Sequence, residues 1–232
     1  TTGNAVVYNV FHRNQNKYLS RYDQPFFFNT SLTYTTPKIG WNKTLSAVLG
    51  DWAIAGFVQY ASGFPLQVPN AQTNLNNYLF QGASFANRKP GEPLFTVDLN
   101  CHCYDPNKTF VLNPNAWEDP APGQFGKSAA YYSDYRTQRR PMENMSIGRT
   151  FPLGGERVTL SVRMEFSNIF NRSYWADPTG ASLTNAKLQQ TTLPNGDTSA
   201  GFGRVLTTGA TAFGTTANLL PRQGLFVARL SF

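Results

Sequence analysis

The feature that most constrains the fold of this chain is a period-two alternation of apolar and polar residues, repeated in segments of about ten residues. The clearest segment is 157–167, where Val, Leu, Val, Met and Phe alternate with Arg, Thr, Ser, Arg, Glu and Ser. Successive side chains of a β-strand point to opposite faces, so the pattern predicts a strand with one apolar and one polar face. Similar patterns predict strands at 26–36, 52–60, 142–151 and 223–232, and a weaker one near 5–11.

The composition favours an all-β fold and excludes several other classes. Charged residues make up 14% of the 232 residues, against roughly 25% in an average soluble domain, and aromatic residues also make up 14%. The net charge of +7 is spread thinly and forms no basic block, so we expect no nucleic-acid partner. No apolar run approaches the ~20 residues of a membrane helix. The N-terminus shows no signal peptide, so we expect that one was removed or that the chain begins inside a longer protein.

The lengths of the strands and of their connections favour a membrane barrel. Strands of about ten residues suit a tilted membrane crossing, whereas soluble strands commonly have ~5–6 residues. The connections 64–141 and 171–221 are long, whereas the one near 152–156 is a short turn. Short turns on one side and long loops on the other are typical of outer-membrane barrels. We therefore predict an all-β, antiparallel transmembrane β-barrel segment of about six strands with two long extracellular loops. Periodicity alone leaves a soluble β-sandwich open.

The two faces of the predicted strands have different expected environments. Aromatic residues bound the apolar face, as in the interfacial girdles of outer-membrane barrels, so we expect this face toward lipid. Charged residues facing lipid are costly, so we expect those of the polar face toward the lumen, where they pair with one another or contact a plug. The bounding aromatic residues are Trp52, Tyr60, Phe166, Phe226 and Phe232. The charged residues of the polar face are Arg163, Glu165 and Arg229.

Several short motifs follow one another in a characteristic order. The chain also ends on Phe232 with apolar residues at every second position back through Leu230 to Phe226, similar to the signal read by the outer-membrane assembly machinery. The motifs are LGDWAIAGF at 49–57, ASGFP at 61–65, LNPNAW at 112–117, PGQFG at 122–126, RMEFSNIFN at 163–171, GFGRV at 201–205 and PRQ at 221–223. Together they resemble the C-terminal part of TonB-dependent receptors of the Oar-like type, which carry an N-terminal carboxypeptidase-regulatory-like domain.

The resemblance implies a role in binding or importing a scarce ligand across the bacterial outer membrane. Such receptors have a 22-stranded barrel, an internal plug and a short box that binds TonB, and this chain would supply only wall and loops. The implied partners are outer-membrane lipid, the plug and upstream strands of the receptor, and TonB through a missing N-terminal part. External loops would bind the ligand and the plug would then move. No covalent chemistry and no cofactor are implied, so we do not expect an enzyme.

An aromatic and basic stretch in the first long loop is the candidate ligand-binding site. Aromatic faces beside arginines can stack on sugars or hold an anionic ligand. The competing interpretation is that the rings pack the loop onto its neighbours or lie at the membrane interface. The candidate residues are Trp117, Tyr131, Tyr132, Tyr135, Arg136 and Arg139.

The cluster Cys101-His102-Cys103 is the candidate metal site. Thiolate and imidazole are ligands that zinc and copper accept. The spacing is not that of a usual zinc site, however, and a plain loop or a strained disulfide stays open. Two alternative functions follow. One is a small complete barrel or soluble β-rich module that binds a glycan or protein through loop 64–141, and the other is a secreted metal-dependent enzyme that uses the cysteine cluster.

Overall fold

The computed structural model describes residues 11–38, 46, 48–71, 84–101, 103–153, 158–172, 175–179, 188–206 and 221–232. The chain divides into two compact units. We call residues 26–62, 140–174 and 217–232 the sheet unit, and residues 1–25, 63–139 and 175–216 the loop unit. Regular structure in both units is mainly β, which confirms the predicted all-β class. In the described part of the chain no helix is long and apolar enough to span a membrane.

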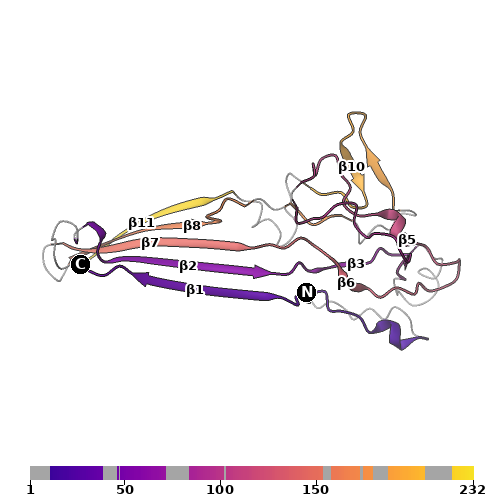
Figure 1. The fold of residues 1–232 in the computed structure, drawn as a ribbon, viewed down its shortest axis with the longest axis horizontal. Coiled ribbons are helices and arrows are strands. Elements are labelled where there is room, and N and C mark those ends of the chain that lie inside the picture. Colours follow the sequence, from indigo (N-terminus) through magenta and orange to yellow (C-terminus); the bar gives the residue numbers. More distant parts are fainter. Residues whose placement is uncertain are drawn as a thin grey trace. The chain divides into compact units, whose positions relative to one another are not determined.

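The sheet unit is one antiparallel sheet with the strand order β1-β2-β7-β8-β11 (Figure 1). The observed strand ends differ from the predicted ones by at most two residues. Most of the strand predicted near 5–11 lies outside the described residues. The strands are β1 (Phe27–Thr35), β2 (Trp52–Ala61), β7 (Met142–Leu153), β8 (Val158–Ser167) and β11 (Gln223–Ser231).

The two ends of the sheet differ in their connections. At one end, β7 and β8 are joined by residues 154–157, and we call this the turn end. At the opposite end, which we call the loop end, the chain leaves β2 and β8 and returns much later to β7 and β11. Both long connections therefore start and finish at the loop end of the sheet. Among the described residues, β1 and β11 are the sheet edges, because each pairs on one side only.

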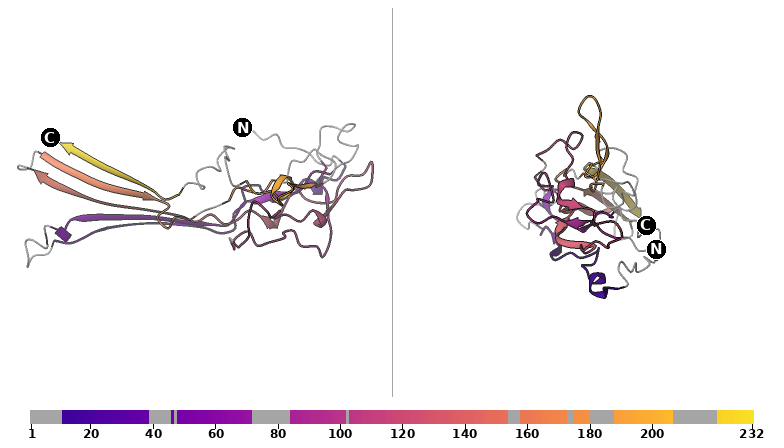
Figure 2. Two further views of the ribbon diagram at one scale, coloured as in Figure 1. Left: turned by 90° about the horizontal axis from the view of Figure 1, so that it is seen from above. Right: turned by 90° about the vertical axis from the view of Figure 1, so that its right-hand side faces the viewer.

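The sheet is curved, and its polar face is the hollow one. Figure 2 shows that the five strands lie on a curved surface rather than in one plane. A broad hollow takes lining residues from all five strands, including Ser31 of β1, Asn144 of β7 and Gln223 of β11. The strand pairing places these residues on the polar face. A sheet that curves around its polar face has the geometry of a barrel wall around a lumen.

The loop unit contains short strand pairs where the sequence predicted only long loops. β3 pairs with β6, β4 with β5, and β9 with β10, all antiparallel. The 3-10 helix η2 (Pro114–Ala116) is capped at its N-terminus by Asn113, whose side chain accepts a hydrogen bond from the Asn115 amide. The other 3-10 helix is η1 (Arg13–Asn16). The strands are β3 (Pro65–Gln67), β4 (Asn87–Arg88), β5 (Trp117–Glu118), β6 (Tyr131–Arg136), β9 (Gln190–Thr192) and β10 (Thr198–Gly201).

The loop unit has its own hydrophobic core, and two of the receptor-like motifs meet in it. Phe202 of the GFGRV motif is fully buried, together with Leu112 of the LNPNAW motif. Gly203 has a φ of +81°, and a Cβ there would lie 2.5 Å from the Leu112 backbone nitrogen. Glycine is therefore required at this position both for its conformation and for the close approach. The two long connections thus fold into one packed structure.

Candidate functional site

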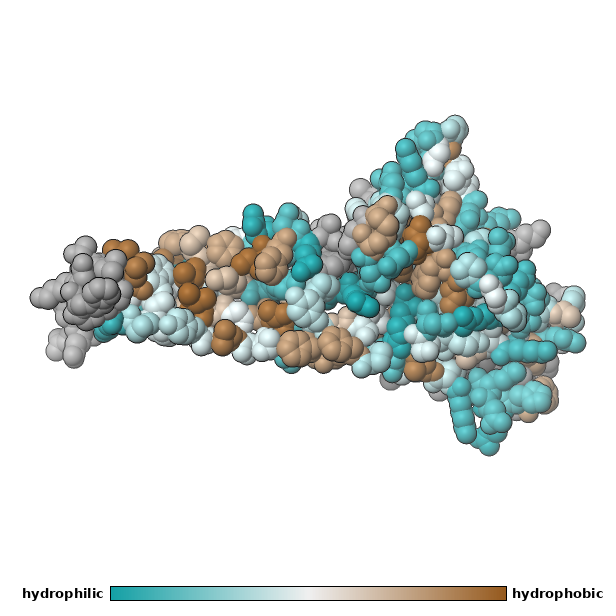
Figure 3. Space-filling view, in the orientation of Figure 1, coloured by the Kyte–Doolittle hydropathy of each residue, from teal (hydrophilic) through white to brown (hydrophobic). Residues whose placement is uncertain are grey.

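The apolar face of the sheet is continuous across all five strands. The pairing places Ile54 opposite Ile147, Ile147 opposite Met164, and Met164 opposite Phe226. Many large side chains on this face are exposed, and Figure 3 shows apolar side chains lying open along the strands. An exposed apolar surface of this extent marks an interaction with a membrane or a partner. The face comprises Phe28, Thr30, Leu32, Tyr34, Trp52, Ile54, Gly56, Val58, Tyr60, Glu143, Met145, Ile147, Arg149, Phe151, Leu153, Val158, Leu160, Val162, Met164, Phe166, Gly224, Phe226, Ala228 and Leu230.

Aromatic side chains lie near both ends of this apolar face. On β2 they are Tyr60 at the loop end and Trp52 at the turn end, a span of nine residues that matches the ~9–11 residues of a membrane-crossing strand. Aromatic girdles at both interfaces are characteristic of outer-membrane barrels. The loop-end girdle consists of Phe28, Tyr60, Phe166 and Phe226, and the turn-end girdle includes Tyr34, Trp52 and Phe151. Phe232, which directly follows β11, continues the alternation of that strand, and we count it in the turn-end girdle.

The girdles run obliquely to the strands. When positions are followed through the strand pairing, Phe226 on β11 lies six residues closer to the turn end than Tyr60 on β2, three strands away. In the same way, Phe232 lies four residues further in this direction than Trp52 on β2. Shifts of about 1.3 and 2 residues per strand correspond to a tilt of roughly 43–55°, at about 3.4 Å per residue and about 4.8 Å between strands. The lower end of this range meets the ~35–45° tilt of known outer-membrane barrels.

Among the described strand residues of the apolar face, two are charged, and one lies near each girdle. Glu143 lies near the loop end and is 2% exposed. Its carboxylate accepts hydrogen bonds from the Arg172 Nε at 3.0 and 3.1 Å and from the Tyr60 hydroxyl at 3.0 Å. Pairing makes a buried charge tolerable, because an unpaired carboxylate would lose its hydration without compensation. Arg149, near the turn end, lies over the rings of Trp52 and Phe151.

The RMEFSNIFN motif explains how Arg172 reaches Glu143. Asn168 follows β8 with a φ of 50°, and its side chain exchanges two hydrogen bonds of 2.8 Å with the backbone of Arg172. Asn171 then accepts a hydrogen bond from the Arg222 amide just before β11.

Sequence reasoning missed the cluster formed by Glu143, Arg172 and Tyr60. A signal was present, because an acidic residue occupies an apolar-face position of the 142–151 alternation.

The polar face carries the three charged residues that the alternation assigned to it. Arg163 and Glu165 form an ion pair with 2.6 Å between Nη2 and Oε1, two residues apart on β8. Arg229 lies opposite Ser161 on the same face. The Thr150 and Ser161 hydroxyls are hydrogen-bonded at 2.7 Å across β7 and β8. This face is therefore a polar, partly charged surface around a hollow, as expected of a barrel lumen.

The loop unit buries two of the six candidate ligand residues. Trp117 is 4% exposed and Tyr135 is 1% exposed, and their ring centroids lie 5.3 Å apart in the core. Burial also raises the pKa of the Tyr135 hydroxyl well above its usual value. In this conformation neither ring offers a face to a ligand, so both serve packing. This is the competing interpretation of the aromatic stretch.

The other four candidate residues lie nearer the surface, and each has contacts of its own. Tyr131 packs against Tyr18, and the ring of Tyr132 lies under the Arg88 guanidinium at 5.4 Å. Arg139 is exposed, and its amide donates to the Asn100 side chain. Ligand contact by these residues stays a prediction.

Arg136 is a structural residue of the loop unit. Its guanidinium contacts the Asp23 carboxylate at 2.5 Å and donates to the backbone carbonyls of Asp23, Gly63 and Ser133. The side chain is only 15% exposed, so the pair is partly shielded from water. Arg136 therefore ties the N-terminal segment 11–25 to β6 and to the start of the first long connection.

Replacing Arg136 by Ala should release segment 11–25. Several charge-assisted hydrogen bonds are lost and the Asp23 carboxylate loses its partner, so we expect about 2 kcal/mol of local destabilisation. Trypsin cleavage after Arg13, Lys17 or Arg21 in the complete folded protein should accelerate about tenfold or more. Arg139→Ala is the matched control and should leave the cleavage rate unchanged. Equal rates in both variants would show that Arg136 does not hold this segment.

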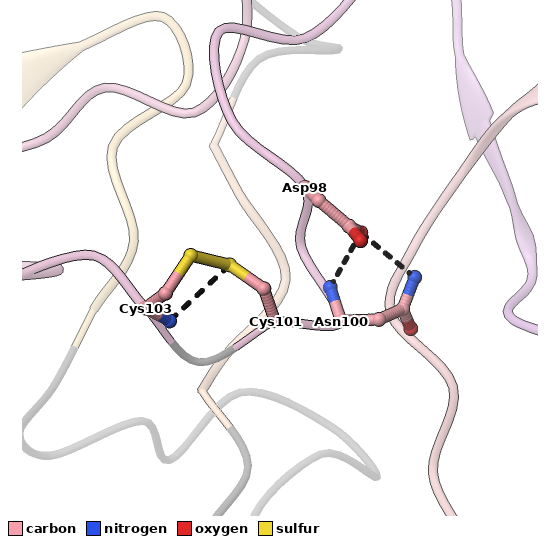
Figure 4. The surroundings of a disulfide bond; sticks show 4 residues. All are labelled: Asp98, Asn100, Cys101 and Cys103. Carbon is pink, nitrogen blue, oxygen red and sulfur yellow. Dashed lines mark hydrogen bonds between the residues drawn. A yellow bond between two sulfur atoms is a disulfide. The ribbon is translucent and has the colours of Figure 1, made fainter.

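The cysteine pair forms a disulfide between Cys101 and Cys103, one of the outcomes left open by the sequence. Figure 4 shows the preceding turn, in which the Asp98 carboxylate accepts from the backbone and side-chain nitrogens of Asn100. Sulfurs in a disulfide are not thiolates, so metal binding by this cluster would require its reduction. His102 lies outside the described residues, and within them no cluster suited to a metal ion occurs. The metal site stays a prediction.

The curved sheet, its membrane-length strands, its two girdles and its polar hollow face define the wall of an outer-membrane β-barrel. The sequence model of the family described as "Outer membrane beta barrel domain" matches residues 1–223. The chain belongs to this family and is located in the bacterial outer membrane. Neither a curated protein nor a solved structure matches the chain. The soluble module that periodicity left open does not agree with this location.

Proposed function

We propose that the chain forms wall and external loops of a TonB-dependent receptor that binds or imports a scarce ligand. The observation that carries this proposal is the packed loop unit, because loops of an ordinary pore need no core of their own. Its core includes Phe202, Leu112 and Trp117, which belong to receptor-like motifs. A folded external unit can present a ligand-binding surface with defined geometry, as rigid scaffolds do for binding loops.

The membrane geometry sets the side on which the loops lie. Outer-membrane barrels have short periplasmic turns and long extracellular loops, so the loop end of the sheet faces the exterior. The lumen would be lined by the polar face with its ion pair between Arg163 and Glu165. In the proposed mechanism a ligand binds the external loops, and force transmitted by TonB then displaces a plug from the lumen. The mechanism involves no covalent chemistry and no cofactor.

The open sheet edges support a wall that continues in both directions. Among the described residues, the edge strands β1 and β11 pair on one side only, and backbone groups cannot remain unsatisfied in hydrocarbon. We therefore include further strands and the plug of the receptor among the proposed partners, with TonB as the periplasmic partner. Outer-membrane lipid covers the apolar face.

Conductance and TonB binding of the complete protein test this proposal together. In planar lipid bilayers we expect almost no ion conductance until urea unfolds the plug, because a plug fills the lumen of a receptor. The purified C-terminal domain of TonB should be retained by the immobilised protein. A steady open-pore conductance without urea, together with no retention of TonB, would favour the alternative of a small complete barrel.

A further inference from the structure

Segment 11–25 has a fixed position on the loop unit. It leads directly into β1 at the loop end of the sheet, the end that faces the exterior in an outer-membrane barrel. Three side-chain contacts attach it to the first long connection, and each joins residues more than a hundred positions apart in the chain. They are Phe11 with Phe125, Tyr18 with Tyr131, and Asp23 with Arg136. The segment therefore presents its other side chains in a defined arrangement.

The exposed side of this segment is basic. Arg13, Lys17 and Arg21 are exposed, and within the described part of the chain none of them forms an ion pair. The segment contains one carboxylate, that of Asp23, which is already paired with Arg136. The segment thus offers three cations, one at every fourth position, to an anion from outside the chain.

Tyrosine rings lie beside the last of these cations. The Arg21 guanidinium lies over the Tyr22 ring at 4.5 Å and donates a hydrogen bond to the Tyr22 hydroxyl. Burial raises the pKa of the Tyr131 hydroxyl, and Arg21, Tyr18 and Tyr22 also act on this group electrostatically, so the four side chains lie close together. Tyr22 is 66% exposed and Tyr18 is 37% exposed. We call Tyr18, Arg21, Tyr22 and Tyr131 the tyrosine cluster.

We propose that the tyrosine cluster and the cations of segment 11–25 bind an acidic polysaccharide at the outer surface of the cell. An amphipathic tyrosine ring suits the face of a sugar ring, and a guanidinium fork suits a carboxylate. A polymer with a carboxylate on each sugar ring can engage several of the cations at once, which raises its affinity. This inference rests on the proposed receptor function and names the class of its ligand.

Other polyanions fit these observations less well. A polyanion without rings would leave the tyrosines unused, although Tyr22 is largely exposed beside Arg21. A nucleic acid requires a denser basic surface than this thinly charged chain provides. Both therefore serve as competing ligands in the test.

Binding of polygalacturonate to the complete protein in lipid nanodiscs tests the site. Its fully methyl-esterified form has the same sugar rings without the charge and should bind about tenfold more weakly or less. Arg21→Gln should weaken binding of the acidic polymer about fivefold, and the triple variant Arg13→Gln, Lys17→Gln, Arg21→Gln about tenfold or more, as expected for lost charge-assisted hydrogen bonds. Tyr22→Ala should weaken it about fivefold, whereas Tyr22→Phe, which keeps the ring, should bind almost as the wild-type protein does.

The matched control is Lys108→Gln, which removes an exposed lysine of the loop unit outside segment 11–25 and should leave binding unchanged. All substituted side chains are exposed, so each variant should fold as the wild-type protein does. Absence of binding, equal binding of the methyl-esterified polymer, of polyglutamate or of a single-stranded oligonucleotide, or equal losses in Arg21→Gln and Lys108→Gln would each overturn the assignment. TonB retention and conductance should be unchanged in all these variants, so this inference and the receptor proposal can fail separately.

Discussion

Replacing Ile147 by Arg should destabilise the barrel by about 2–4 kcal/mol, the cost of an arginine facing lipid at the bilayer midplane. Ile147 lies on the apolar face of β7, between Glu143 near the loop-end girdle and Phe151 in the turn-end girdle. The oblique course of the girdles places it close to the middle of the apolar band. Arginine at this depth cannot reach either interface without distorting the bilayer or the strand.

The effect is measured by guanidinium chloride unfolding of the complete protein in lipid vesicles, followed by tryptophan fluorescence. Ser146→Arg is the control, because Ser146 is the adjacent residue on the polar face and lies opposite Glu165. The new arginine would there face a carboxylate in the lumen, so we expect a change within about 0.5 kcal/mol. A large loss in Ser146→Arg with a small one in Ile147→Arg would invert the assignment of the two faces.

The second large effect concerns the core of the loop unit. Phe202→Ala should destabilise this unit by about 3–5 kcal/mol, the usual cost of removing a buried aromatic ring. Phe202 is 0% exposed and packs with residues of both long connections, so its loss removes contacts that hold them together. The sheet unit should remain assembled, because its stability rests on its own strand pairing and on lipid contacts.

Limited proteolysis of intact cells separates the two units. We expect faster cleavage within 63–139 and 175–206 in Phe202→Ala, with the membrane strands still protected and the barrel still heat-modifiable on gels. Leu193→Ala is the control, since Leu193 is exposed between β9 and β10 and should be tolerated. If Phe202→Ala instead abolished assembly of the whole barrel, the loop unit could not be an independently folded structure.

The membrane strands could be predicted because they are governed by one simple rule. Lipid on one side and a polar lumen on the other impose an alternation that the sequence displays directly, so the ends of β2 and β8 could be located from the residues alone. The charges on the polar face, such as the pair Arg163 and Glu165, follow from the same rule.

The loop unit could not be predicted in the same way. Its core joins residues far apart in the chain, such as Val68, Trp117 and Phe202. These residues lie in or beside strands of only two to six residues, which show no long periodic pattern. Such cores depend on tertiary packing, which local alternation does not encode. For this reason the sequence could not separate core residues from surface residues in the aromatic stretch. Two residues of the candidate ligand site, Trp117 and Tyr135, are buried in the core.

The charged residues at the girdles were missed because each charge is stabilised by a side chain outside its own strand. Glu143 depends on Arg172, which the turn after β8 positions, and Arg149 depends on rings of two strands. Alternation identifies such residues only as exceptions. Their positions near the two ends of the apolar band become apparent once the register is known.

The most direct test of the central claim is the environment of successive residues on β2. Single cysteines at positions 53–58, in a background with Cys101 and Cys103 replaced by Ser, would carry nitroxide spin labels in the complete protein in lipid vesicles. Collisions with oxygen, which concentrates in lipid, should be frequent at 54, 56 and 58 and rare at 53, 55 and 57. The opposite alternation, or no alternation, would contradict the assignment of the apolar face to lipid and of the hollow polar face to the lumen.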